Sequence, residues 1–337
     1  MGSPLYIVSK EEIEKIRYIF RGLEDAYGVQ YAVARGNDYS KKLKGKVHTK
    51  WGKVTDKLWE DHLKGLDPSL GIIPINRENK CVWGCIDIDT YPFDHAGLVK
   101  KINARQLPLI VCRSKSGGAH IFLFTQEPAS AELMYIKLKE IAACLGYSNK
   151  EIFPKQKTIQ KEEIGNFLNM PYHGGDASTR YAFTKEGKRA TLKEFVALYG
   201  DTVRFTKDLN SIRILPEIKH FEDGPPCLQM ICEQGGVREG EGVRNTFMYN
   251  VSVYHQKKYG KEWLNSGGCE KINTEFVHPT YLSPKLTTIM NSVDKVKEYN
   301  YQCNLNPLCS HCNRTLCLTR QYGVGGADRR MPVISSV

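Results

Sequence analysis

The first half of the chain alternates short apolar runs with stretches of helical periodicity. Apolar side chains recur at helical spacing through residues 10–27, and Ser9 followed by Glu12 forms a capping box, so a helix is expected there. Strands are expected at the apolar runs 31–33, 71–75, 82–88, 109–112 and 120–124, with shorter runs at 151–153, 166–170 and 180–183. Helical patterns occupy residues 94–104, 129–145 and 191–199. Strands that alternate with helices predict an α/β or α+β fold rather than a sandwich.

The pattern changes after Leu215-Pro216. A Gly224-Pro225-Pro226 stop precedes a helix-rich stretch in which Asn245 is a candidate N-cap. We therefore predict an α/β domain at residues 1–215, a smaller helical domain at 216–325, and a linker or tail at 326–337.

Composition narrows the class of protein. Hydrophobic residues make up 41% and charged residues 25% of the 337 residues, as in ordinary globular proteins, and no apolar run approaches the length of a membrane span. No signal peptide is visible at the N-terminus. The odd number of cysteines, 11, favours thiols or metal ligands in a reducing cytoplasm over disulfides.

The chain is basic, since lysine and arginine exceed the acids by 48 − 37 = 11 charges. Several lysines crowd one segment around Trp51, namely Lys41, Lys42, Lys44, Lys46, Lys50, Lys53 and Lys57. Charge alone favours a solvated loop there. Beside a phosphate site, the segment becomes a candidate groove for a nucleic-acid backbone, with Trp51 as a stacking aromatic.

Two aspartates end the apolar run at 82–88. In a strand, Asp87 and Asp89 point to one face while the isoleucines between and before them enter the core. Two carboxylates on one face repel each other unless a cation lies between them. Mg²⁺ is held in this way, by one or two carboxylates together with substrate phosphates.

A glycine-rich turn follows in the segment 113–120. Its simplest interpretation is a hairpin whose glycines adopt positive φ. Lys115 and His120, which flank Gly117-Gly118, favour a phosphate contact instead. Glu151 begins another apolar run and would supply a third carboxylate, which completes the minimum set for two-metal phosphoryl transfer.

These segments resemble a known family. Asp87-Ile88-Asp89, the segment 116–120 (SGGAH) and the segment 151–156 (EIFPKQ) are similar, in order, to the three motifs of archaeo-eukaryotic primases, particularly the primase-polymerases of phages and mobile elements. The resemblance continues into segments 166–172 and 242–245 and the terminal cysteines. It implies a primase-type catalytic domain, with Asp87, Asp89 and Glu151 as ligands of two Mg²⁺ or Mn²⁺ ions and His120 as a triphosphate contact.

The same resemblance implies nucleotidyl transfer on a single-stranded DNA template, with nucleoside triphosphates as substrates. Lys115, Ser116 and the amides of Gly117 and Gly118 would brace the triphosphate. Asn166, Tyr172 and Arg180 are candidates for nucleotide or template contacts, and a structural role for each is equally economical. A helicase, fused beyond Val337 or acting as a partner, is a further expectation from the family.

The terminal cysteines form a second candidate site, with the spacing Cys303-x5-Cys309-x2-Cys312-x4-Cys317. Four thiolates with a central C-x2-C suit structural Zn²⁺ in a knuckle, and an Fe–S cluster also accepts four thiolates. His311 is an alternative ligand. The helical domain would then hold the template or the first nucleotide during initiation.

We therefore expect a cytoplasmic, DNA-dependent primase-polymerase. A metal-dependent nuclease would use the same carboxylates, and a non-catalytic, zinc-containing origin-binding module would need none of them. A glycosyltransferase with an Asp-x-Asp metal site is disfavoured by the cysteines and the basic charge. The preference for ribonucleotides or deoxynucleotides is left open by the sequence.

Overall fold

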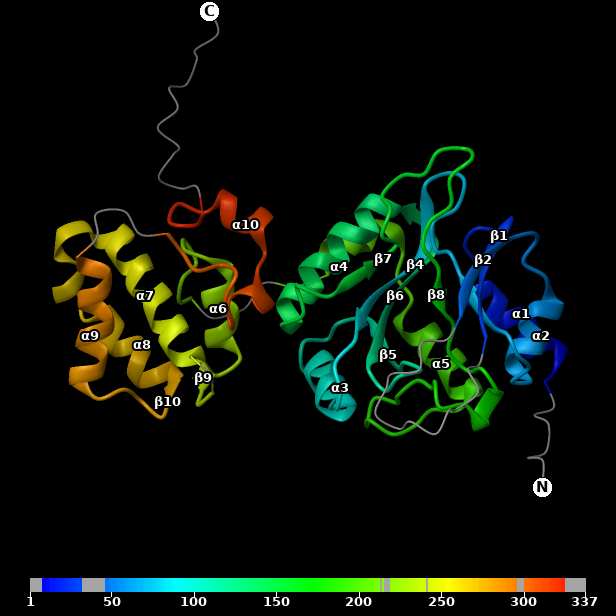
Figure 1. Cartoon of the computed structure of the whole chain (residues 1–337), viewed down its shortest axis with the longest axis horizontal. Coiled ribbons are helices and arrows are strands. Elements are labelled where there is room, and N and C mark those ends of the chain that lie inside the picture. The colour runs from blue at the N-terminus through cyan, green and yellow to red at the C-terminus, as the bar shows by residue number, and fades with distance from the viewer. Residues whose placement is uncertain are drawn as a thin grey trace, which may run out of the picture. The chain divides into compact units, whose positions relative to one another are not determined.

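The computed structural model describes residues 8–31, 46–212, 214, 219–240, 242–295 and 300–324. The chain divides into two compact units, which we describe separately: residues 1–139 with 150–213, and residues 140–149 with 214–337 (Figure 1). The tail expected at 326–337 lies outside the described residues, as do Lys41, Lys42 and Lys44. No helix among the described residues is both long enough and apolar enough to span a membrane.

The described residues of the first unit form two antiparallel sheets of four strands each. The first sheet has the order β2-β1-β3-β8, with β1 at Ala26–Gln30, β2 at Val47–Trp51, β3 at Ser69–Ile72 and β8 at Leu168–Asn169. The second has the order β5-β6-β4-β7, with β4 at Lys80–Ile88, β5 at Leu109–Arg113, β6 at Ala119–Ser130 and β7 at Glu151–Phe153. The expected mixed fold of strands and helices is confirmed.

Among the described residues, the α-helices that accompany these sheets are α1 at Lys10–Ile19, α2 at Asp56–Leu63, α3 at His95–Ala104, α4 at Ala131–Leu145 and α5 at Leu192–Thr202. The end of α4, from residue 140, belongs to the second unit. The 3-10 helices η1 at Gly175–Ala177 and η2 at Thr206–Ser211 lie in the connections. In Figure 1, α3 and α4 lie on one side of the second sheet and α1 and α2 on the other. Gly84 of β4 allows α4 to approach closely, because an added Cβ would lie 2.5 Å from Cδ1 of Leu138.

The main core of this unit is aromatic and fills the space between the sheets. Phe20, Trp59, Trp83 and Phe195 are all fully buried in it. The rings of Phe20 and Phe195 stack with centroids 5.7 Å apart, and the Trp83 ring meets Phe20 edge-on at 5.7 Å. Because Trp83 lies on β4, this core fixes the strand that carries the two aspartates.

The N-terminal helix is shorter than the periodicity predicts. Its capping box at Ser9 and Glu12 is confirmed, but α1 ends at Ile19 rather than at residue 27. An added Cβ at Gly22 would lie 2.1 Å from the carbonyl oxygen of Ile73, and the N–H of Leu23 donates to that oxygen. The chain therefore joins the first sheet as β1 at Ala26–Gln30, whereas residues 32 and 33 of the strand expected at 31–33 lie outside the described residues.

A buried histidine links α2 to the first sheet. The Nε2 of His62 lies 2.8 Å from the carbonyl oxygen of Pro171, and its Nδ1 accepts the N–H of Leu70 at 3.0 Å. The ring is therefore neutral, with its proton on Nε2. Complete burial, reinforced by the nearby His173 and Arg180, holds the pKa of His62 well below its usual range.

The second unit is helical, as expected. Its α-helices are α6 at Pro226–Glu233, α7 at Val243–Tyr259, α8 at Gly268–Phe276, α9 at Ser283–Asp294 and α10 at Arg314–Thr319. The 3-10 helices η3 at Gly260–Asn265 and η4 at Cys309–His311 and a two-strand parallel sheet, β9 at Val237–Arg238 and β10 at Val277–His278, complete it. Central α7 buries Phe247, Met248 and Val251 in one core, and its N-cap is Gly242 rather than the expected Asn245.

Candidate active site

Three side chains with acid–base or metal-binding chemistry lie level on neighbouring strands. In the second sheet, Asp87 of β4 is the register partner of His120 of β6 on one side and of Glu151 of β7 on the other. Partners in an antiparallel sheet project to the same face, with Cβ atoms about 5 Å apart. The strand pairing therefore places two carboxyl groups and an imidazole in one row. Asp89, two residues beyond Asp87, is on the same face, and we call these four residues the acidic row.

The acidic row continues the core face of β4. Trp83 and Cys85 precede Asp87 and Asp89 at alternate positions and are fully buried in the core between the sheets. Ile86 lies on the opposite face and is also fully buried. The same face thus changes from apolar to acidic along the strand, as the alternation in the sequence predicts.

Asp87 is partly buried and incompletely partnered. Its side chain is 18% exposed, and its Oδ1 has no hydrogen bond in the described structure, although the Nε2 of His120 lies 3.4 Å away. A carboxylate oxygen without a partner in a partly buried position is costly unless a cation or donor reaches it. The position suits a ligand of a hard divalent ion.

The other two carboxylates have partners at the rim. An oxygen of Asp89 accepts the hydroxyl of Tyr91 at 2.6 Å, and Glu151 forms an ion pair with Lys155 at 2.7 Å. Among the described residues, no group of three or more His, Cys, Asp or Glu side chains is already arranged to hold a metal ion. The oxygen donors are of the right chemical class for Mg²⁺ or Mn²⁺, but Asp89 and Glu151 would have to exchange their partners for the ion.

The glycine-rich segment forms a tight hairpin between β5 and β6. The N–H of Gly117 donates to the carbonyl oxygen of Ser114 within the turn, so this amide is already engaged rather than presented to a ligand. Gly117 has φ +97°, and an added Cβ at Gly118 would lie 2.1 Å from the carbonyl oxygen of Ile88. Both glycines therefore hold the turn against the end of β4, while Lys115 and Ser116 face the pocket.

A pocket of about 220 Å³ opens in front of the acidic row, between the two sheets of the first unit. It is lined by Gln30, Asp87, Asp89, Arg113, Ser114, Lys115, Ser116, His120, Phe153, Phe167, Leu168, Asn169, Met170, Pro171 and Arg180. Ser114 Oγ, Asn169 Oδ1 and Asp87 Oδ1 are buried atoms without a hydrogen bond in the described structure. Such atoms are uncommon in folded proteins, and three in one pocket favour a binding site.

Arg180 occupies the wall opposite the acidic row. It is 7% exposed and donates to Ser69 Oγ and to Gln30 Oε1, and it forms no ion pair with a carboxylate among the described residues. Burial lowers the pKa of Arg180 to about 10, so the guanidinium remains charged at neutral pH. Burial, with Arg180 as a smaller contributor, also lowers the pKa of Lys115. The wall is suited to an anion.

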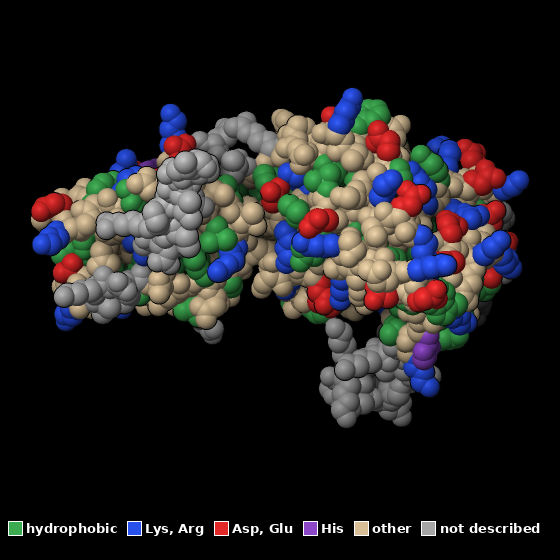
Figure 2. Space-filling view, turned by 90° about the horizontal axis from the view of Figure 1, so that it is seen from above, with side chains coloured by type: hydrophobic (Ala, Val, Ile, Leu, Met, Phe, Trp, Pro, Cys, Tyr) green, Lys and Arg blue, Asp and Glu red, His purple; other side chains and the backbone are tan. Residues whose placement is uncertain are grey.

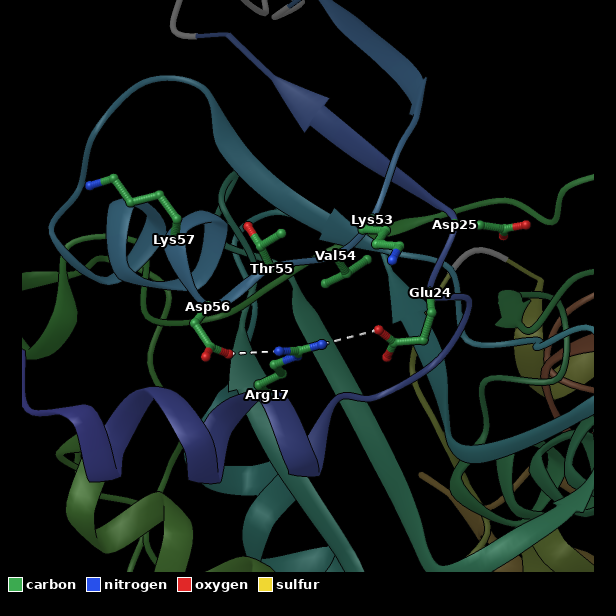
Figure 3. A pocket seen from close by; sticks show the side chains of 8 residues that line it. All are labelled: Arg17, Glu24, Asp25, Lys53, Val54, Thr55, Asp56 and Lys57. Carbon is green, nitrogen blue, oxygen red and sulfur yellow. Dashed lines mark hydrogen bonds and ion pairs between the residues drawn. The ribbon is translucent and has the colours of Figure 1, made fainter.

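A larger pocket of about 640 Å³ shows the opposite situation (Figure 3). There Arg17 bonds Asp56 at 2.7 Å and Glu24 at 3.2 Å, and the hydrogen bond to Asp56 raises the pKa of the arginine. The charge of Arg17 is thus satisfied within the protein, and its bond to Asp56 ties α1 to α2. The smaller pocket, with its unpaired groups, is the better candidate for chemistry.

Two predicted contact residues lie outside the pocket lining. Asn166 is exposed and exchanges two hydrogen bonds with Gln156, at 2.7 and 3.0 Å. Tyr172 is fully buried, and its hydroxyl donates to the carbonyl oxygen of Ala190 and accepts the N–H of Ala182. The structure thus gives these two residues structural contacts.

Sequence reasoning did not identify Phe167, Asn169 or Gln30. The Phe167 ring lies over Gly28 and Gly71, where an added Cβ would approach it within 2.2 and 2.3 Å, respectively. These paired glycines leave room for an aromatic wall of the pocket. The polar Asn169 within an apolar run was the available signal, whereas Gln30 gave none.

The cysteine cluster of the second unit differs from the predicted set. Cys303, Cys312 and Cys317 line one small cavity together with Cys227 of α6, whereas Cys309 does not line it. His311 packs against the end of α4, since an added Cβ at Gly146 would lie 3.0 Å from its Nε2. No disulfide links any of the eleven cysteines, all of which lie in described residues.

The fold and the family comparison together define an archaeo-eukaryotic primase domain, which implies a nucleotidyltransferase. Residues 11–198 match the family model described as the archaeo-eukaryotic primase domain of TOTE conflict systems. The chain belongs to this family, and the resemblance expected from the three motifs is confirmed. Archaeo-eukaryotic primases generally use divalent metals.

Two solved structures show a low likeness to this chain. The primase domain (PP-N190) of the cyanophage S-2L primase-polymerase is 11% identical, covers 56% of this chain and 97% of its own, and gives a TM-score of 0.31. The primase RepB′ is 10% identical, covers 89% of this chain and 96% of its own, and gives a TM-score of 0.30. Comparison with curated proteins gives no match.

Proposed function

We propose that the protein is a DNA-dependent primase-polymerase that synthesises primers on single-stranded DNA. The observation that carries the proposal is one pocket with an incompletely partnered carboxylate row on one wall and a buried arginine without an acidic partner on the other. A metal-bound nucleoside triphosphate carries both complementary charges. The replication setting, a phage or other mobile element, belongs to the same proposal and rests on the resemblance of the motifs.

Asp87, Asp89 and Glu151 would hold the Mg²⁺ or Mn²⁺ ions. When bound, the ions activate the 3′-hydroxyl and neutralise the triphosphate and the leaving pyrophosphate. Asp87 would bind an ion without rearrangement of its backbone, because its strand is paired on both sides within the sheet. The protein's own contribution is then a fixed carboxylate in a site whose walls are rigid strands.

The opposite wall would bind the triphosphate. Arg180 offers a planar fork of donors, and Lys115 and Ser116 lie on the hairpin that lines the same pocket. His120 adds an imidazole beside Asp87, where a phosphate oxygen and a metal-bound carboxylate would meet. Phe167 presents an apolar ring on which a base or sugar can pack.

A template strand is best accommodated along β2. This strand is at the edge of the first sheet and exposes all five of its side chains, with Trp51 59% exposed and the Arg77 guanidinium 5.5 Å from its ring centroid. Lys46 precedes this strand and Lys50 belongs to it, whereas Lys57 forms ion pairs with Asp61 and Glu60. Exposed aromatics beside basic side chains are typical of single-strand binding.

The remaining surface gives no stronger candidate on the face shown in Figure 2. There the Lys and Arg side chains are interspersed with Asp and Glu rather than gathered by sign. A local contact that combines charge with stacking therefore suits the template better than a broad basic surface.

The decisive experiment supplies a single-stranded template with Mg²⁺ or Mn²⁺ and labelled nucleotides, without added primer. We expect new oligonucleotides from the wild type and from Glu14→Ala, a control that removes an exposed carboxylate on α1. Asp87→Ala should remain folded and lose synthesis, because it removes the central carboxylate of the row. Shortening of the template would indicate a nuclease, and template binding without synthesis in both wild type and variant would indicate a binding module.

A further inference from the structure

Four thiols from two distant parts of the chain line one small cavity in the second unit. Cys227 comes from the first turn of α6, and Cys303, Cys312 and Cys317 come from the C-terminal segment. The cavity volume is about 20 Å³, which is room for roughly one water-sized particle. An ion-sized space whose lining includes four cysteines is a candidate metal site.

The cavity is fixed by contacts between the two segments. Arg320 donates to the carbonyl oxygens of Phe221 and Gly224 at 2.9 and 3.0 Å and to Gln229 Oε1 at 2.7 Å. The N–H of Tyr322 donates to the carbonyl oxygen of Asp223 at 2.8 Å. The C-terminal segment is thus hydrogen-bonded to residues on both sides of Cys227. These bonds hold Cys227 beside the three cysteines of the C-terminal segment.

Cys309 is directed elsewhere. Its Sγ donates to Asn306 Oδ1 at 3.0 Å, and its carbonyl oxygen accepts the hydroxyl of Ser148. The hydroxyl oxygen of Ser148 in turn accepts the N–H of Cys312 at 3.2 Å. Ser148 thus holds the backbone of both cysteines, but only Cys312 lines the cavity, whereas the Sγ of Cys309 is bonded to Asn306.

We propose that Cys227, Cys303, Cys312 and Cys317 bind one Zn²⁺ ion as a tetrahedral tetrathiolate site, and that Cys309 is not a ligand. Four sulfur donors without an open position are typical of structural zinc. Binding converts four thiols and Zn²⁺ into a complex of net charge −2 and releases four protons. Arg314 lines the same cavity and supplies positive charge beside that complex.

The thiols are gathered but not yet in a ligand shell, since no described cluster of His, Cys, Asp or Glu is arranged to hold a metal. Metal capture therefore requires the side chains to turn inward around a backbone that is already held. If one ion bound both Cys227 and Cys303, which lie 303 − 227 = 76 positions apart, it would close a loop that contains α7, α8 and α9. Zinc would then stabilise the whole helical unit rather than a local C-terminal knuckle.

The test measures zinc per chain in the full-length protein, purified without chelator, by elemental analysis. We expect about one zinc in the wild type and in Cys309→Ser, and a several-fold lower content in Cys227→Ser. Cys232→Ser is the matched control, because it removes another buried thiol of the same helix that does not line the cavity. It should retain zinc.

A second measurement does not require the Cys227→Ser variant to fold. Cobalt substituted into the wild type and into Cys309→Ser should give the same thiolate-to-cobalt charge-transfer intensity, as expected for four sulfur ligands in each. Loss of zinc in Cys309→Ser together with its retention in Cys227→Ser would overturn the proposed ligand set. A metal-free wild type would overturn the site itself, and iron with acid-labile sulfide would assign an iron–sulfur cluster instead.

Discussion

Arg180→Met should stabilise the free protein while it weakens nucleotide binding. The guanidinium is buried, and its bonds go to the neutral Ser69 and Gln30 rather than to a carboxylate. A buried charge without an opposite charge costs free energy, and methionine fills a similar volume without that cost. The same unpaired charge that would bind phosphate lowers the stability of the free protein, so its removal should raise that stability.

The pKa of Arg180 gives the magnitude. Burial lowers it from 12.5 to about 10, and this difference corresponds to about 3 kcal/mol of unfavourable free energy for the charged form. The variant loses hydrogen bonds of 3.3 to 3.4 Å, which are long, and their loss costs about 1 kcal/mol in total. Ser69 keeps a bond to the carbonyl oxygen of Gln30 at 3.3 Å, so its hydroxyl is not orphaned. The variant should therefore gain about 2 kcal/mol.

The assay must report on the first unit alone, because two compact units need not unfold together. Native-state hydrogen exchange of peptides from β1 and β3 follows the strands that carry Gln30 and Ser69. The same exchange, repeated with a nucleoside triphosphate and Mg²⁺, measures binding through added protection, which grows with the logarithm of ligand concentration over Kd. We expect slower exchange in the free variant and little added protection on ligand addition.

Two results would refute the reasoning. Faster exchange in the free variant by more than about tenfold, or about 1.4 kcal/mol, would show that Arg180 stabilises the fold and is structural. Unchanged protection by nucleotide would show that the arginine does not contact the triphosphate. Arg180→Lys separates charge from geometry, because it retains the former and loses the bidentate fork.

Two further predictions concern buried side chains of the first unit. Acid should destabilise this unit as pH falls below about 6.5. His62 is neutral in the folded unit because its pKa is held well below the usual value, and it takes up a proton on unfolding. One such site lowers the free energy of unfolding by up to about 1.4 kcal/mol per pH unit. His62→Gln, which can reproduce both hydrogen bonds, should flatten the pH dependence of chemical unfolding; an unaltered slope would assign the effect elsewhere. Tyr172→Phe should cost about 1–3 kcal/mol through the lost bonds to Ala182 and Ala190 and leave the KM for nucleotide unchanged. A raised KM at unchanged stability would return Tyr172 to the nucleotide site.

The sequence could predict the acidic face because that inference uses a local rule. Alternation along a strand places Asp87 and Asp89 together whatever surrounds them, and the glycines of the turn at 114–118 indicate a hairpin in the same way. Helices α3, α4 and α5 were likewise expected near their observed positions, since each presents its own periodic pattern.

The rest depended on which segments meet. Local periodicity continued the first helix past Ile19, but the chain there pairs with Ile73, and β1 forms instead. Spacing grouped Cys309 with Cys312, yet the fourth thiol at the cavity is Cys227, far away along the chain. Likewise, the sequence around Arg180 does not indicate that no carboxylate contacts this arginine in the described part of the fold. Each of these facts is set by tertiary contacts that a single sequence does not display.

The charges of the pocket have a consequence for the order in which ligands bind. Asp87 and Arg180 line the same cavity of about 220 Å³, so a cation at the acidic row and an anion at the arginine wall lie within one low-dielectric space. The cation neutralises Asp87, which would otherwise repel the anion, and the anion neutralises Arg180, which would otherwise repel the cation. This coupling between the two ligands is reciprocal by thermodynamic necessity. Under the proposed function, the metal ion therefore tightens triphosphate binding by the same factor by which the triphosphate tightens metal binding. Asp89 and Glu151 are held by Tyr91 and Lys155 in the free protein, so under the proposed function they would exchange these partners for the ion when the substrate binds.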